Sequence, residues 1–118
     1  MKTSLALLPY VFIGGGLGAS LRFCLGLMIS TLSLKVWSAT VLVNLIGTAC
    51  YCLSVKVFGG ERIHHEFFRV GLLGSLTTFS TLSFEIATSL KQGQYLTAGA
   101  IFTLNIIAGV LIAIGILR

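Results

Sequence analysis

Long apolar runs separated by short polar stretches make up this chain. They cover residues 5–29, 36–55, 70–90 and 96–117. A helix needs about 20 mostly apolar residues to cross the roughly 30 Å hydrocarbon core of a bilayer. Each run has about that length. The pattern therefore predicts one domain over residues 1–118, an all-α membrane protein with four transmembrane helices.

The connections between these runs are short and polar. They are expected at residues 30–35, 56–69 and 91–95. The middle connection, KVFGGERIHHEFFR, carries most of the charge. Its adjacent histidines, His64 and His65, would not share a helix face. We therefore interpret them as loop residues at the membrane interface and not as metal ligands.

The composition supports a membrane location. The chain is 56% hydrophobic and only 9% charged, whereas a soluble domain carries roughly a quarter charged residues. The first run is too long for a cleaved signal peptide and contains Arg22. The net charge of +5 does not indicate nucleic-acid binding, because the basic residues are scattered over connections on both membrane faces.

The basic residues also predict an orientation. One side of the membrane would hold Lys2, Lys56, Arg62, Arg69 and Arg118, and the other side only Lys35 and Lys91. The positive-inside rule then places both termini in the cytoplasm of a cell-membrane protein.

Nothing in the sequence indicates an enzyme. It contains no nucleophile–base pair, metal cluster or phosphate loop. Cys24, Cys50 and Cys52 fall within predicted spans, where we expect them to pack. The glycine-rich GGGLG of residues 14–18 lies inside a span, so close packing explains it better than nucleotide binding.

Small residues in membrane helices favour close helix contacts. Gly14 and Gly18 have the small-xxx-small spacing in the first span. The fourth span offers Ala108, Gly109, Ala113 and Gly115. Because four short helices leave little room for an enclosed aqueous path, we expect a pore to form between subunits of an oligomer, most simply a dimer.

Two polar residues in the first two spans each allow two interpretations. Asn44 lies in mid-span, four residues after Thr40 on the same helix face. It forms either a helix–helix hydrogen bond, worth about 1 kcal/mol in membranes, or a pore-lining donor. Arg22 either snorkels to the interface or has a functional role, in binding the dimer partner or in drawing anions into a vestibule.

The third span is unusual because six hydroxyl side chains occur between Ser75 and Ser83, beside Gly71 and Gly74. Such side chains compete for backbone hydrogen bonds. Non-helical backbone at membrane depth persists only when it is buried in protein or lines a cavity, and broken helices of this kind carry ion sites. The alternative is a polar helix–helix seam.

The stretch GSLTTFSTLSFE of residues 74–85 resembles the signature of the Fluc (CrcB-like) fluoride channels, usually GGLTTFSTFSxE. The glycine-rich GGGLGASLRF of the first span and TxxVN of the second, here Thr40 to Asn44, match in order and spacing. The resemblance covers essentially the whole chain.

The resemblance implies an antiparallel dimer that lets fluoride leave the cytoplasm passively and so confers fluoride resistance. Each dimer would carry two pores. The broken third helices would cross at the centre, where the backbone carbonyls of Gly74 and Thr77 from both subunits hold a structural sodium ion (Na+).

The resemblance also implies roles for side chains. Phe79 would line the fluoride path with the positive edge of its ring. The hydrogen-bond donors would be Asn44, Ser80 and Thr40, with Glu85 toward the pore end and Arg22 as the first-helix arginine.

Three features depart from the family pattern. Leu82 replaces a second phenylalanine, and the fourth span keeps Asn105 but has Gly109 and Ala113 where hydroxyls are usual. The bias of basic residues is also large for a subunit that inserts in both orientations. We therefore hypothesise a fixed-topology pair in which an oppositely oriented homologous subunit replaces the second copy and one pore is degenerate.

Two other classes stay open. A small four-helix, proton-coupled multidrug exporter needs a carboxylate, typically in its first helix, but here that helix carries Arg22 and Glu85 lies late in the third span. A non-conducting membrane subunit, including the non-conducting partner in a heterodimeric fluoride channel, would explain the small residues but not the hydroxyl cluster.

Overall fold

The computed structural model describes residues 5–118, which form an all-helical chain with four helices long and apolar enough to cross a membrane. The first two spans are α2 (Leu8–Thr31) and α3 (Trp37–Phe58). The third contains α4 (Arg62–His64), η1 (His65–Leu73), α5 (Gly74–Leu76) and α6 (Phe79–Lys91). The fourth contains α7 (Tyr95–Phe102), η2 (Thr103–Ala108) and α8 (Gly109–Leu117). The predicted all-α, multi-pass architecture is confirmed.

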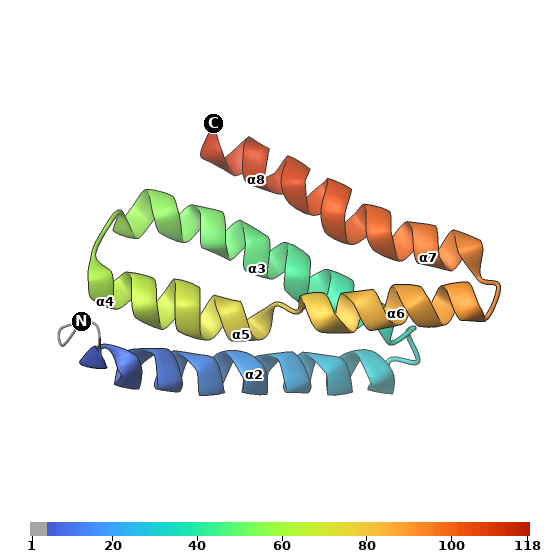
Figure 1. Cartoon of the computed structure of the whole chain (residues 1–118), viewed down its shortest axis with the longest axis horizontal. Helices are drawn as coiled ribbons and strands as arrows, with labels where there is room; N and C mark the ends of the chain where they lie inside the picture. The colour runs from blue at the N-terminus through green and yellow to red at the C-terminus, as the bar shows by residue number, and fades with distance from the viewer. Residues whose placement is uncertain (1–4) are drawn as a thin grey trace.

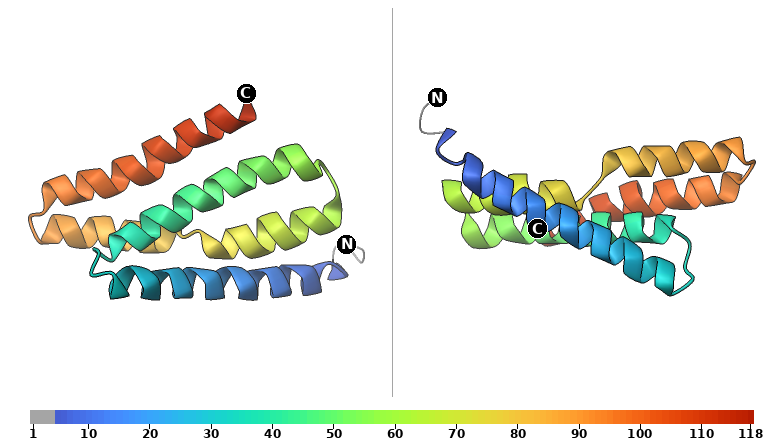
Figure 2. Two further views of the ribbon diagram at one scale, coloured as in Figure 1. Left: turned by 180° about the vertical axis from the view of Figure 1, so that it is seen from behind. Right: turned by 90° about the horizontal axis from the view of Figure 1, so that it is seen from below.

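The spans alternate in direction along the long axis, so α2 begins and α8 ends toward the same end of the molecule (Figure 1). The first span lies along η1 and α5. The fourth span packs α7 against α6 and α8 against α3, on the side away from α2 (Figure 2). Lys2, which entered the count of basic residues, lies outside the described residues.

The single proline and two glycines mark helix ends. Pro9 lies in the first turn of α2, where its missing N–H has no helical partner to lose. Gly59 has φ +54° and ends α3. Gly93 has φ +72° and follows α6. Positive φ is easily adopted only by glycine, so these residues allow the short turns.

The third span begins earlier than the sequence predicts. Residues 62–69 were expected to belong to a connection, but they are helical, and both histidines lie in this segment. Helices can continue beyond the hydrocarbon core wherever water solvates their charged side chains. The Phe58 ring also stacks on His64, with centroids 4.8 Å apart, and on Phe68, at 5.4 Å. These contacts hold the helix start against the end of α3.

Two residues with extended backbone separate α5 from α6. Thr77 has φ −78° and ψ 156°, and Thr78 has φ −150° and ψ 118° (Figure 1). The third span is therefore two helical segments joined near its middle. The backbone groups at this junction need hydrogen-bond partners other than those of a helix.

Glycines bring α2 into contact with the backbone of the third span. A Cβ on Gly14 would overlap the Phe67 carbonyl oxygen, and a Cβ on Gly18 would overlap the Leu72 carbonyl oxygen. The spacing of these two glycines predicts a close helix contact, and both are buried against the third span of the same chain. The spacing marks a tight helix contact but does not identify the helix that makes it.

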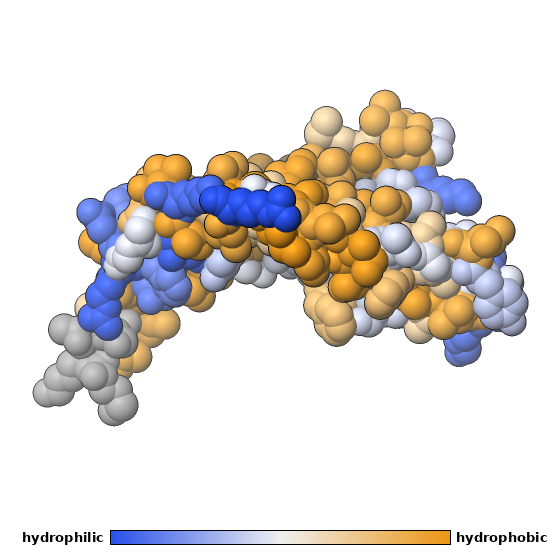
Figure 3. All heavy atoms as spheres, turned by 90° about the horizontal axis from the view of Figure 1, so that it is seen from above, coloured by the Kyte–Doolittle hydropathy of each residue, from blue (hydrophilic) through white to orange (hydrophobic). Residues whose placement is uncertain are grey.

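Large apolar side chains cover most of the outer surface, as the face in Figure 3 illustrates. The buried apolar core is small and includes Val43, Leu73, Leu76 and Ile101. A soluble protein buries its large apolar residues instead. This inside-out distribution is typical of a protein whose outer surface contacts lipid or another subunit.

The contact between α2 and the third span predicts a stability difference. Replacement of Gly18 by Ala should destabilise the protein by about 1–3 kcal/mol, because the added methyl group forces two backbones apart. Gly16→Ala is the matched control, since no atom lies within 4 Å of a Cβ built there. Thermal unfolding in detergent measures both changes. Equal melting temperatures for the two variants would contradict the prediction.

Candidate functional site

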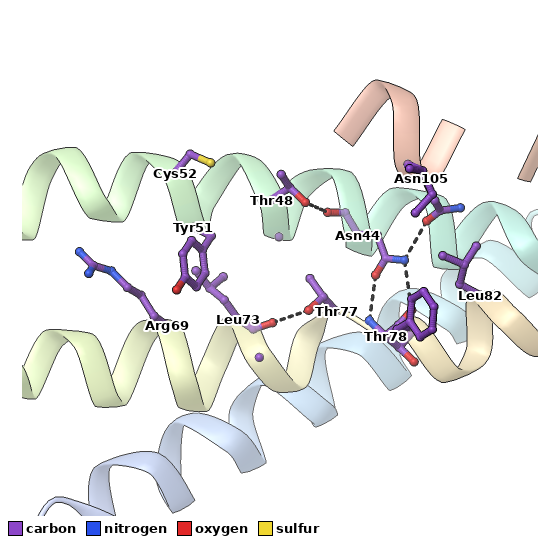
Figure 4. A pocket seen from close by; sticks show the side chains of 14 residues that line it. Asn44, Thr48, Tyr51, Cys52, Arg69, Leu73, Thr77, Thr78, Leu82 and Asn105 are labelled. Carbon is purple, nitrogen blue, oxygen red and sulfur yellow. Dashed lines mark hydrogen bonds between the residues drawn. The ribbon is translucent and has the colours of Figure 1, made fainter. Parts of the chain in front are cut away.

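The Asn44 side chain of α3 pairs with the backbone of Thr78 at the junction in the third span. Asn44 Oδ1 accepts the Thr78 N–H at 2.8 Å, and Asn44 Nδ2 donates to the Thr78 carbonyl at 3.2 Å. The amide thus satisfies both backbone groups of one extended residue, as a neighbouring β-strand would (Figure 4). This contact ties α3 to the junction.

Asn105 of η2 fixes the orientation of the Asn44 amide. Asn44 Nδ2 also donates to Asn105 Oδ1 at 2.7 Å, and Asn105 Nδ2 donates to the Ile101 carbonyl at 2.8 Å. Because Asn105 presents its oxygen to Asn44, the Asn44 amide must present its nitrogen in return. Both N–H groups of Asn44 therefore bond protein atoms.

The Thr78 side chain caps the start of α6. Its hydroxyl accepts the Thr81 N–H at 3.2 Å and lies 3.0 Å from the Thr81 hydroxyl, to which it donates. The Ser80 hydroxyl lies 3.2 Å from the same oxygen. Threonine is a favoured residue at this position because its oxygen satisfies a free N–H of the first turn.

These bonds take helical donors away from two carbonyl groups. In a continuous helix the Thr78 N–H would bond the Gly74 carbonyl, and the Thr81 N–H would bond the Thr77 carbonyl. Here the first donates to Asn44 and the second to the Thr78 hydroxyl. Gly74 is also exposed on the subunit surface, and Thr77 is half-buried. Both predicted carbonyl ligands are thus left without their usual helical donors.

A groove of about 440 Å³ runs beside the junction between α3, the third span and η2. We name it the Phe79 groove; residues that line it include Asn44, Tyr51, Arg69, Thr77, Phe79, Leu82 and Asn105 (Figure 4). The Phe79 side chain is 74% exposed, whereas Leu82 is only 3% exposed. The groove therefore combines a largely exposed aromatic ring with the amides of Asn44 and Asn105.

A second groove, of about 370 Å³, lies between α2, α3 and α6. We name it the Arg22 groove; its lining includes Arg22, Thr40, Thr78, Thr81 and Glu85. The Thr40 hydroxyl donates to Glu85 Oε1 at 2.8 Å, and Glu85 Oε2 has no partner among the described residues. Among residues 5–118, no ion pair within 4.0 Å joins Arg22 to Glu85. Thr78 lines both grooves.

The structure distributes the predicted site residues over these two grooves. The Phe79 groove holds Phe79, Asn44, Gly74, Thr77 and Leu82, and the Arg22 groove holds Arg22, Thr40 and Glu85. Ser80 lines neither groove; it is exposed at the start of α6 and lies beside the Thr78 hydroxyl.

The partners of Asn44 were not predicted from the sequence. Neither Thr78 nor Asn105 was connected to that amide, although Asn105 is the only asparagine in the fourth span. A threonine directly before a helix is also a recognised capping signal. The cysteines lie apart from this network: Cys52 lines the Phe79 groove, and Cys24 and Cys50 are exposed on the outer surface.

Comparison with known proteins places the chain in a family. Residues 9–116 match the family model described as CrcB-like protein, Camphor Resistance. Curated relatives include a protein of Burkholderia cenocepacia, 38% identical over 81% of this chain and 78% of its own length. A Serratia proteamaculans protein is 34% identical over 81% of this chain and 79% of its own. Both are named fluoride-specific ion channel FluC.

A relative from Staphylococcus epidermidis, named fluoride-specific ion channel FluC 1, is 37% identical over 74% of each chain. The family match spans all four membrane-crossing helices and both grooves. The chain therefore belongs to the CrcB-like protein family.

Proposed function

We propose that this chain is a subunit of a fluoride-selective channel that exports cytoplasmic fluoride by passive permeation. The observation that carries the proposal is the Phe79 groove, in which Phe79 lies beside an asparagine amide at the helix junction. The relatives named as fluoride-specific ion channels support the same function. They are channels and not enzymes, in agreement with the lack of catalytic motifs in the sequence.

The chemistry of the groove suits a small anion. A ring edge carries the positive end of the aromatic quadrupole and attracts an anion without a full charge. The Asn44 amide supplies N–H donors, and its bond to the Thr78 carbonyl is the longer of the two that it donates, at 3.2 Å against 2.7 Å. We propose that fluoride replaces this longer bond as it passes.

The Arg22 groove is the second polar region of the proposed path. The Thr40 hydroxyl, the Glu85 carboxylate and the Arg22 guanidinium line it, and the junction residue Thr78 connects it to the Phe79 groove. Thr40 acts as a donor that Glu85 holds in place, and Ser80 supplies a hydroxyl at the start of α6. The bond from Thr40 to Glu85 would break when the Thr40 hydroxyl donates to an anion instead.

The junction also suits a sodium ion at the contact between two subunits. Hard monovalent cations prefer oxygen ligands, and the Gly74 and Thr77 carbonyls have lost their usual helical donors. One subunit supplies only two such oxygens. An antiparallel partner would bring the set to four and would cover the exposed Gly74 and Phe79.

The partner in the proposed dimer is either a second copy or an oppositely oriented homologue. Lys56, Arg62, Arg69 and Arg118 lie toward one end of the spans, and Lys35 and Lys91 toward the other. This asymmetry favours one orientation, with the termini in the cytoplasm, and therefore a partner of opposite charge bias. The buried Leu82 beside Phe79 also supports such a pair, in which one of the two pores is degenerate.

Fluoride efflux from loaded vesicles tests the proposal. We expect rapid, fluoride-selective efflux, recorded with a fluoride electrode, when the chain is reconstituted with its oppositely oriented homologue. The chain alone should conduct at least about tenfold more slowly if its topology is fixed. Efflux from the chain alone that equals efflux from the pair would refute the heterodimer. No fluoride efflux from either preparation would refute the channel.

Phe79 should be needed for conduction. Phe79→Ile should lower the efflux rate at least about tenfold, because an aliphatic side chain has no positive edge. Phe84→Ile is the matched control: Phe84 is similarly exposed, at 70%, on the same helix, but lines neither groove. Similar losses of efflux in the two variants would refute a specific role for Phe79.

The Asn44 pairing predicts an effect on both stability and transport. Asn44→Leu leaves the Thr78 N–H and carbonyl without partners at membrane depth and should cost about 1–3 kcal/mol of stability. Asn44→Asp keeps an acceptor for the Thr78 N–H but loses both donors. We therefore expect Asn44→Asp to be the more stable variant and both to lose fluoride efflux. Thermal unfolding and vesicle efflux measure the two effects, and equal stability of the variants would contradict the pairing.

A further inference from the structure

Arg69 of η1 is held across the end of α3. Its Nε donates to the Ser54 hydroxyl at 3.1 Å, and its Nη2 donates to the carbonyls of Ser54 and Gly59, each at 2.9 Å. Gly59 adopts φ +54°, a conformation that favours glycine, in the turn that presents its carbonyl to the guanidinium. The head group of Arg69 is therefore fixed in position by three bonds.

All three acceptors are neutral, so the charge of Arg69 is not cancelled. Among residues 5–118, no carboxylate oxygen lies within 4.0 Å of the guanidinium, and the Nη1 amino group bonds no protein atom. Two N–H groups of a permanent cation thus stay available. Such charge-assisted donors bind anions about twice as strongly as neutral donors do.

This cation lines the Phe79 groove. Figure 4 shows Arg69 at one end and Asn44, Leu82 and Asn105 toward the other, with Tyr51 between them. The Tyr51 hydroxyl points from α3 toward the third span and makes no hydrogen bond within the described part of the chain. A full positive charge and a free hydroxyl therefore line the path that leads to the aromatic ring and the amides.

We propose that Arg69, with the Tyr51 hydroxyl, forms an outer anion-binding subsite that concentrates fluoride at the end of the Phe79 groove. This inference rests on the proposed channel function and deepens it. A fixed charge in a groove with apolar walls raises the local concentration of counter-ions. Because three of its five N–H groups bond the protein, Arg69 has only two left for an anion, and the site stays weak enough to release it.

A purely structural role is the alternative, since Arg69 also fastens the end of α3. Three variants separate the two roles. Arg69→Gln removes the charge. Arg69→Lys keeps the charge but loses the planar fork that reaches several acceptors at once. Lys56→Gln is the control for charge alone, because Lys56 is exposed in the last turn of α3 and lines neither groove.

Fluoride efflux is measured with the subunit combination in which the wild-type chain conducts. Two ionic strengths are used: about 10 mM, where the Debye length is about 30 Å, and about 1 M, where it is about 3 Å. We expect Arg69→Gln to lower the efflux rate about fivefold at low ionic strength and less than about twofold at high ionic strength. Arg69→Lys and Lys56→Gln should stay within about twofold of the wild type at both. Thermal unfolding of each variant is recorded alongside.

An Arg69→Gln variant with the salt dependence of the wild type would overturn the subsite and leave the channel function standing. Equal losses of efflux and of melting temperature in Arg69→Gln and Arg69→Lys would also overturn it, in favour of the structural role. Absence of efflux from every wild-type combination would refute the channel function, and the subsite with it.

Discussion

The pairing of the Asn44 amide with the Thr78 backbone is the interaction on which this arrangement depends. A membrane offers no water to an exposed N–H or carbonyl, and each unsatisfied group there costs several kcal/mol. Two extended residues in the middle of a span are therefore tolerated only if protein groups replace the helical bonds. The Asn44 amide bonds both the N–H and the carbonyl of Thr78, and Asn105 keeps that amide correctly oriented. The junction is thus built by three spans together.

The same bonds create the chemistry of the junction. Because the Thr78 N–H donates to Asn44 and the Thr81 N–H donates to the Thr78 hydroxyl, the carbonyls of Gly74 and Thr77 lack their helical donors. The two extended residues therefore leave spare acceptors at the surface of the chain and a well-bonded polar core on the inside. Thr78 lies between the two grooves, so any change in its backbone would alter both of them.

Much of the fold is predictable from the sequence, because bilayer thickness and hydropathy fix the number and length of the spans. The start of the third span was predicted wrongly, since the charged residues 62–69 obscure a helix that continues into the interface. The close contact of Gly14 and Gly18 was predicted, but spacing alone does not identify the third span as the opposing element. The bond between Asn44 and Asn105 joins residues 61 positions apart, and local patterns carry no information about such pairs.

The donors proposed for fluoride at the junction are all engaged in the structure, and this constrains how a channel would use them. Asn44 bonds Thr78 and Asn105, the Thr40 hydroxyl bonds Glu85, and the Ser80 hydroxyl lies beside Thr78. An anion that enters must exchange with these bonds, so the net gain of binding is small. A channel needs this balance, because an ion held by several fully free donors would not leave. In the proposed channel, the bonds that stabilise the junction would thereby also favour fast release of the ion.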